Sequence, residues 1–388
     1  MSTVIHLPGP DGTTQRRVLR APTAWPRPAT PPTSRIAYAA AHVVADPLGG
    51  NAPGAPAAVD WDATLAFRRH LWSYGLGVAE AMDTAQRGMG LDWPATAELI
   101  RRGAAEAKAC GGRIAAGAGT DHAEVDLAGL DDVVRAYEQQ LAVVEEAGAT
   151  VILMASRQLA RLARGPEDYH KVYGRLLEQT GAPVILHWLG PMFDPTLEGY
   201  WGSADLATAT SSFVGLVHDH AASVDGVKVS LLDADHEVAL RRALPPGVKL
   251  YTGDDFNYPE LILGDDVSAS HALLGIFAAI APAASAALQA LDRGDRAAYQ
   301  AAFAPTVPLA RQVFGPPTYY YKTGIAFLAW LCGHQRGFCM VGGLQSGRSL
   351  PHLVETFRLA DDAGLLPDPE LAAARMRRFL TVMGVEAR

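Results

Sequence analysis

Residues 224 to 232 have the sequence Val224-Asp-Gly-Val-Lys-Val-Ser-Leu-Leu232. Parallel strands that are covered on both faces form near-continuous apolar runs, and this stretch fits such a strand except for Lys228 near its centre. Lysine is rarely buried without a partner, and burial lowers the pKa of its amine from about 10.4. The neutral amine can attack a carbonyl and form a Schiff base, whereas a lysine at a strand end would simply extend its amine into solvent.

Short apolar runs like this one recur along the chain and alternate with segments of helical period. Eight such runs cover residues 36–43, 77–82, 113–118, 150–154, 183–188, 226–230, 248–251 and 271–277. Between the third and fourth runs, residues 130–146 place Val133, Tyr137 and Leu141 on one face and are followed by Gly148, which indicates an amphipathic helix. Eight alternating units predict a (β/α)8 TIM barrel in the α/β class, whose active site lies at the carboxyl ends of the strands.

The remaining residues suggest two additions to the barrel. Residues 1–34 are rich in Pro, Gly and Thr, which favours an irregular N-terminal arm. The barrel itself is predicted over residues 35–293. No strand pattern follows, and residues 294–388 are predicted to form a C-terminal helical extension, with helices near 295–313, 318–334, 351–363 and 369–383.

Composition narrows the class of partner. The net charge is −8 without a block of Lys or Arg, so nucleic acid and anionic membranes are not indicated, and a small-molecule substrate is expected. Charged residues make up 19% of the chain, below the roughly 25% of typical domains, which favours buried contacts in a homo-oligomer. Three cysteines without metal spacing and a start without a signal-peptide pattern favour the cytoplasm; they are Cys110, Cys332 and Cys339.

His187 ends the fifth run, beside the strand that carries Lys228. An imidazole, with an unperturbed pKa near 6.5, suits a proton shuttle at the mouth of the barrel. The alternative is a histidine whose ring is bound by a backbone carbonyl.

Acidic residues follow two other runs. Asp83 and Thr84 end the second run, where they would bind a carboxylate or a hydroxylated ligand, or merely form a turn. Gly253, Asp254 and Asp255 end the seventh run, where the glycine permits close backbone approach. The two carboxylates would bind substrate hydroxyls or cap the following helix.

A divalent metal is the alternative use of such side chains. Candidate ligands near strand ends are Glu80, Asp121, His122, His187, Asp254, Asp255 and His271. No local metal-binding spacing links them, so neither a metal nor another cofactor is expected, and a metal-dependent sugar isomerase or lyase stays the second hypothesis.

From about residue 35 to residue 333 the chain resembles the dihydrodipicolinate synthase and N-acetylneuraminate lyase family of class I aldolase-like barrels. The strongest match is Gly226-Val-Lys-Val-Ser230, which resembles the family element that holds the Schiff-base lysine. Supporting matches lie at 115–119, 183–186, 251–255 and 275–282, and the C-terminal helices resemble the family's extension. The resemblance implies an imine on Lys228 and a dimer or tetramer.

Three departures from the family pattern indicate a divergent branch. The loop that grips the carboxylate of pyruvate aligns with residues 83–87 and keeps only Thr84. His187 replaces the tyrosine that relays protons, and Trp188 replaces an asparagine. Residues 155–157 replace the tyrosine pair after strand four.

The sequence therefore predicts a lyase or aldolase that acts on a small keto acid or a carbohydrate-derived ketone. Lys228 and His187 are the predicted catalytic residues. The residues expected to contact substrate are Asp83, Thr84, Trp188, Ser230, Gly253, Asp254 and Asp255. A third hypothesis is a sensing barrel, in which Lys228 only pairs with a ligand carboxylate.

Overall fold

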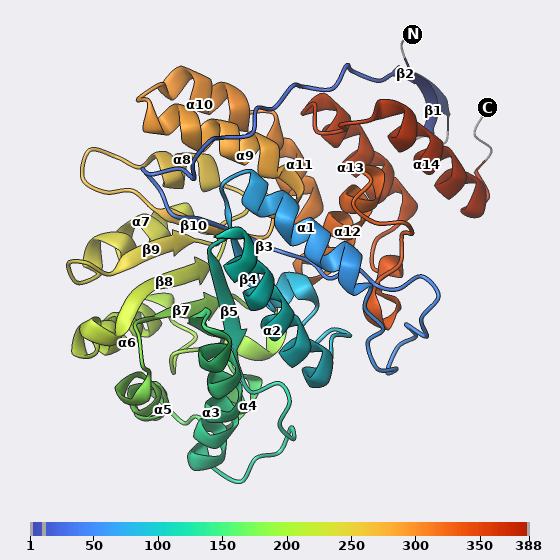
Figure 1. The fold of residues 1–388 in the computed structure, drawn as a ribbon. Helices are drawn as coiled ribbons and strands as arrows, with labels where there is room; N and C mark the ends of the chain where they lie inside the picture. The colour runs from blue at the N-terminus through green and yellow to red at the C-terminus, as the bar shows by residue number, and fades with distance from the viewer. Residues whose placement is uncertain (1–2, 10–12, 386–388) are drawn as a thin grey trace.

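The computed structural model describes residues 3–9 and 13–385. Eight parallel strands close into a barrel in the order β10-β3-β4-β5-β6-β7-β8-β9 (Figure 1). They are β3 (Ala37–Ala40), β4 (Gly77–Glu80), β5 (Ile114–Ala118), β6 (Thr150–Leu153), β7 (Val184–Leu189), β8 (Val224–Ser230), β9 (Lys249–Thr252) and β10 (His271–Leu274). Each strand coincides with one predicted run to within a few residues, so the (β/α)8 prediction is confirmed.

Helices surround the barrel. They are α1 (Trp61–Ser73), α2 (Trp93–Cys110), α3 (Leu130–Ala147), α4 (Arg157–Leu162), α5 (Pro166–Gln179), α6 (Leu206–Asp219), α7 (Ala234–Ala243), α8 (Tyr258–Leu263) and α9 (Phe277–Asp292). Helices α1 to α8 connect consecutive strands, and α9 follows the last strand. The predicted face of α3 is buried, and the helix ends at Gly148, whose φ of 77° suits glycine. Short 3-10 turns are η1 (Asp83–Ala85), η2 (Pro195–Leu197), η3 (Ala221–Ser223), η4 (Thr318–Tyr320) and η5 (Val341–Ser346). Among the described residues no helix has the length and apolarity to cross a membrane.

The C-terminal extension is helical, as predicted. It contains α10 (Arg296–Phe303), α11 (Thr306–Val313), α12 (Tyr321–Leu331), α13 (Leu350–Asp362) and α14 (Pro369–Val382). The segment predicted as one helix near 295–313 forms two, because Pro305 interrupts it. Every residue of α12 is buried, so this helix is the core of the extension.

The N-terminal arm is more ordered than the sequence analysis predicted. It begins with an antiparallel hairpin of β1 (Val4–Pro8) and β2 (Thr14–Val18), which packs on α13 and α14 (Figure 1). Ile5 and Leu7 are fully buried because alternate side chains of β1 face these helices. Arg17 donates to Asp361 over 2.7 Å and anchors the second strand. The expectation of an irregular arm is corrected for this hairpin.

The barrel lumen is filled by side chains from alternate strand positions. Its inner cluster contains Tyr38, Ala40, Ala79, Met82, Ala115, Ile152, Met154, Ile185, Tyr251 and Leu273. On β8, Val227 and Val229 instead belong to the outer core against the helices. Because successive side chains of a strand point to opposite faces, Lys228 lies on the lumen side of β8.

Candidate active site

Lys228 is held in the lumen by its strand neighbours. It pairs with His187 on β7 and with Tyr251 on β9, and only 7% of its surface is exposed. Gly253 leaves room for its stem: a Cβ atom at residue 253 would lie 3.0 Å from Cε of Lys228 and 2.2 Å from Oγ of Ser230. Gly253 therefore positions the lysine rather than offering a group to substrate.

The amine of Lys228 has no fixed partner. Among residues 3–9 and 13–385, no side chain forms a hydrogen bond or an ion pair with it. Burial lowers the pKa of Lys228 below its ordinary value, although the charges of Asp83 and Asp255 oppose that change. Burial likewise raises the pKa of Asp255 to about 8. Both groups are thus displaced toward their neutral forms, as a nucleophilic amine requires.

His187 lies next to this amine and is almost completely buried. Its Nε2 is 3.4 Å from Oγ of Ser230, a long hydrogen bond, and its Nδ1 has no partner among the described residues. Burial, with the charge of Lys228 as a second cause, lowers the pKa of His187 well below its usual range. The ring is therefore neutral at physiological pH and can accept a proton.

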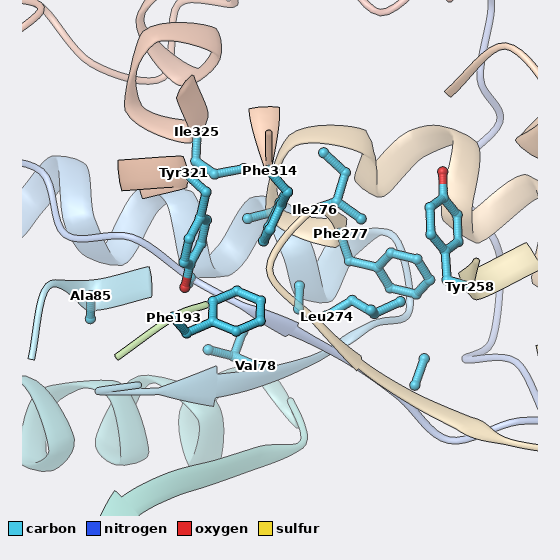
Figure 2. Packing of buried hydrophobic residues seen from close by; sticks show 14 of the residues in the cluster. Val78, Ala85, Phe193, Tyr258, Leu274, Ile276, Phe277, Phe314, Tyr321 and Ile325 are labelled. Atoms are coloured by element: carbon cyan, nitrogen blue, oxygen red, sulfur yellow. The ribbon is translucent and has the colours of Figure 1, made fainter. Parts of the chain in front are cut away.

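Asp83 and Thr84 lie on η1, directly after β4. The carboxylate of Asp83 is half-buried and accepts no hydrogen bond from any described residue, so it is open to a ligand. Oγ1 of Thr84 is 2.8 Å from the hydroxyl of Tyr321, a residue of α12. Figure 2 shows this tyrosine beside Phe314, with its hydroxyl directed toward the segment that carries Ala85.

The two aspartates after β9 have different surroundings. Asp254 accepts hydrogen bonds from the backbone N–H groups of Phe256 and Asn257 over 2.8 and 3.0 Å and from the Asn257 amide. Asp254 therefore stabilises the turn that precedes α8, but it does not cap the helix, whose N-cap residue is Asn257. Asp255 accepts from the Ile276 N–H over 2.8 Å and faces Lys228.

Trp188 lies on the opposite face of β7 from His187. Its ring packs against Trp201, Phe213 and His236 in the layer between barrel and helices. The expectation that Trp188 contacts substrate is corrected, because neighbouring residues of a strand point in opposite directions.

A cavity of about 170 Å³ opens at this end of the barrel. Its lining includes Asp83, Arg87, Thr120, Asp121, Met154, Arg157, Gln158, His187, Leu189 and Asp194. Lys228 is not part of the lining, but Asp83 and His187 are, and both interact electrostatically with it. Ligand pockets usually measure about 300–1,000 Å³, so this one fits a small substrate.

Two residues near the mouth were missed by the sequence analysis. Tyr321 and Lys322 open α12, and the amine of Lys322 donates to the Tyr319 carbonyl over 3.0 Å. Only 2% of Lys322 is exposed, and burial lowers its pKa to about 8. The available signal was a lysine inside an otherwise apolar predicted helix.

The metal candidates do not converge. Glu80 forms a fully buried ion pair with Arg68 at 2.6 Å, and Asp121 pairs with Arg87. His122 contacts Gln139 over 2.7 Å, and His271 lies at the amino end of β10, where it accepts from the Ile36 N–H. Within the described part of the chain, no three His, Cys, Asp or Glu side chains are grouped to hold a metal ion.

Solved structures resemble this fold over most of its length. YagE from E. coli K12, a prophage protein belonging to the dihydrodipicolinic acid synthase family and solved in complex with pyruvate, has 13% identity and a TM-score of 0.67, covering 85% of this chain and 99% of its own. The dihydrodipicolinate synthase from Acinetobacter baumannii, complexed with pyruvate, has 16% identity and a TM-score of 0.62, covering 86% and 100%. That from Thermotoga maritima has 13% identity and a TM-score of 0.64, covering 86% and 100%.

At these identities the likeness concerns the fold, and it confirms the structural resemblance to the dihydrodipicolinate synthase barrels. No curated protein matches the sequence significantly. A family model described as "protein of unknown function (DUF993)" matches residues 5–385. The chain therefore belongs to the DUF993 family.

Proposed function

We propose that this protein is a lyase of the class I aldolase type, in which Lys228 forms an imine with the ketone of a small keto acid or a carbohydrate-derived ketone. The observation that carries the proposal is the amine of Lys228, which is buried in the lumen beside a neutral histidine and has no hydrogen-bond or ion-pair partner among the described residues. The likeness to barrels solved with pyruvate supports the same chemistry.

Covalent catalysis would begin with the neutral amine of Lys228. The amine adds to the ketone carbon, one water leaves, and a protonated imine forms. His187 takes the proton of the substrate's β-hydroxyl, the adjacent carbon–carbon bond breaks, and its electron pair moves toward the imine nitrogen to give an enamine and an aldehyde. His187 then returns the proton to the enamine carbon, and one water hydrolyses the imine to free the ketone product and the amine.

Asp255 would assist the formation of the imine. Its protonated form, favoured by burial, supplies the proton with which water leaves the first adduct. Asp83, which lines the cavity and whose carboxylate is free, would bind a polar group of the substrate. The hydroxyls of Thr84 and Ser230, which contact Tyr321 and His187, would bind others.

Reductive trapping tests the proposal. The protein is incubated with keto acids and keto sugars in the presence of borohydride, and its peptides are analysed by mass spectrometry. We expect a reduced adduct on Lys228 that is absent from Lys228→Ala and kept in Lys171→Ala, an exposed lysine of α5. An unmodified Lys228 across the panel, together with full activity of Lys228→Ala on the true substrate, would refute it. Saturable binding without adduct or turnover would favour the sensing barrel.

Assembly and location stay predictions. We expect a homo-oligomer, a dimer or tetramer, because charged residues are scarce, and we expect it in the cytoplasm. Light scattering on the purified protein measures the first, and imaging of the tagged protein in its host measures the second.

A further inference from the structure

We propose that Lys322, from the C-terminal extension, binds an anionic group of the substrate, a carboxylate or a phosphate, at the mouth of the barrel. The inference rests on the proposed function, because it concerns the same site, and it narrows the substrate to an anionic ketone.

The first argument is the unused hydrogen-bonding capacity of this amine. Lys322 is buried, yet its ammonium donates one hydrogen bond, to the Tyr319 carbonyl, and forms no ion pair within the described ranges. Its nitrogen also lies 4.6 Å from the centre of the Tyr321 ring. An ammonium has three N–H donors. Burying this charge while some of its donors lack acceptors costs free energy, and a bound ligand that accepts their hydrogen bonds would remove that cost.

The second argument is location. Tyr321, the preceding residue, is hydrogen-bonded to Thr84 on η1, so the first turn of α12 lies against the segment that carries Asp83. The charges that act on Lys322 are those of Asp83, Asp194 and Arg157, and all three residues line the cavity at the barrel mouth.

The third argument is the local balance of charge. Asp194 is already engaged, because it accepts from Nε of Arg157 over 2.6 Å and from Thr196. Asp83 is then the open carboxylate near two buried amines, Lys228 and Lys322, since its charge acts on both. A substrate anion would pair with the ammonium of Lys322, while the neutral amine of Lys228 stays free to react with the ketone.

Three small ketones test whether Lys322 binds an anion and whether that anion is a carboxylate or a phosphate. Pyruvate carries a carboxylate, dihydroxyacetone phosphate carries a phosphate, and dihydroxyacetone is neutral. For each ligand, the concentration that gives half-maximal borohydride trapping on Lys228 is measured, and calorimetric binding provides a second readout that needs no imine. We compare the wild type with Lys322→Met, which keeps the stem without the charge, and Lys322→Arg, which keeps the charge.

In the wild type we expect one of the two anions to bind more tightly than dihydroxyacetone, which also identifies the kind of anion. In Lys322→Met the half-maximal concentration for that anion should rise about tenfold or more, as for the loss of one charge-assisted hydrogen bond. Dihydroxyacetone should be unaffected, and Lys322→Arg should retain most of the preference. Lys171→Met is the control for loss of a surface charge.

Equal shifts for all three ligands, no shift for the anion, or no preference for an anion in the wild type would each overturn the inference. Trapping of the neutral ketone on Lys228 with no role for Lys322 leaves the proposed function standing. If no adduct forms but calorimetry shows an anion preference that depends on Lys322, the inference about Lys322 stands and the proposed imine chemistry fails. If Lys322→Met lacks a cooperative thermal transition, Lys322→Gln, which keeps a donor for the Tyr319 carbonyl, replaces it.

Discussion

The hydroxyl of Tyr321 lies 2.8 Å from Oγ1 of Thr84, although 237 positions separate the two residues in the chain. This contact joins the C-terminal extension to the loop that follows the second strand of the barrel. The mouth of the barrel is consequently built from both parts of the chain, and its polar groups depend on the packing of α12.

Tyr321→Phe should weaken both stability and the site. The change leaves the buried Thr84 hydroxyl without its partner, which costs about 1–3 kcal/mol. We expect a lower free energy of unfolding in urea and reduced trapping of ketones on Lys228. Tyr319→Phe, whose ring lies in the same segment, is the matched control. Equal stability of the Tyr321→Phe variant and the wild type would show that the contact is not maintained in solution.

Gly253→Ala should damage the site through crowding. The added Cβ would meet Oγ of Ser230 at 2.2 Å and Cε of Lys228 at 3.0 Å, so both side chains would have to move. Overpacking of this kind costs about 1–3 kcal/mol, and we expect adduct formation on Lys228 to be lost in protein that still folds. Gly50→Ala, where nothing lies within 4 Å, is the control. Normal trapping in Gly253→Ala would contradict the placement of the lysine.

The rate of imine trapping should fall as the pH rises through about 8, with no change near the ordinary pKa of histidine. Burial raises the pKa of Asp255 to about 8, so above this pH the carboxyl loses the proton with which water leaves the first adduct, whereas burial lowers the pKa of Lys228 and favours its neutral amine. His187 stays neutral throughout this range, so it adds no inflection near 6.5.

Asp255→Asn removes the carboxyl whose pKa lies at about 8, so the fall in rate near this pH should be absent. Asp233→Asn, in the loop after β8, should leave it unchanged. Trapping rates with one fixed ketone over a series of buffers measure both effects. A fall in rate at the same pH in Asp255→Asn would exclude Asp255 as the proton donor.

Glu237 should make the folded state less stable as pH rises. Burial raises its pKa in the folded protein to about 8, above the ordinary value of 4.5, while its carboxyl is bonded to Thr252 and Ser270. The contribution is therefore fully present below about pH 4.5 and is lost as the pH rises through about 8, by on the order of 1 kcal/mol per pH unit at most. Chemical denaturation of the wild type and Glu237→Gln over this range should show a smaller loss in the variant. Parallel curves would mean that Glu237 is ionised in the folded protein.

The sequence predicted the barrel well because each buried parallel strand is a short apolar run, and a lysine in such a run is conspicuous. Lys228, His187, Asp83 and Asp255 do meet at one end, since the carboxyl ends of parallel strands share an edge. Trp188 was wrongly predicted to contact substrate because it follows His187 in the sequence. Successive side chains of a strand point to opposite faces, so the Trp188 ring points away from the lumen and packs against the helices.

The sequence could not show that Asp254 and Asp255 have different roles. Adjacent acids after a strand look equivalent in the sequence, and only the folded turn decides which carboxylate binds the backbone of the turn and which one faces the amine. Tyr321 and Lys322 were predicted to lie in a helix, but their place near the barrel mouth could not be predicted, because it depends on the long-range packing of α12.

The hairpin at the start of the chain packs on its last two helices. During synthesis, Ile5 and Leu7 leave the ribosome long before the surfaces of α13 and α14 that cover them. The apolar side of β1 therefore stays uncovered in the nascent chain until α13 and α14 have been synthesised, and chaperones that bind early apolar segments can contact it during that time.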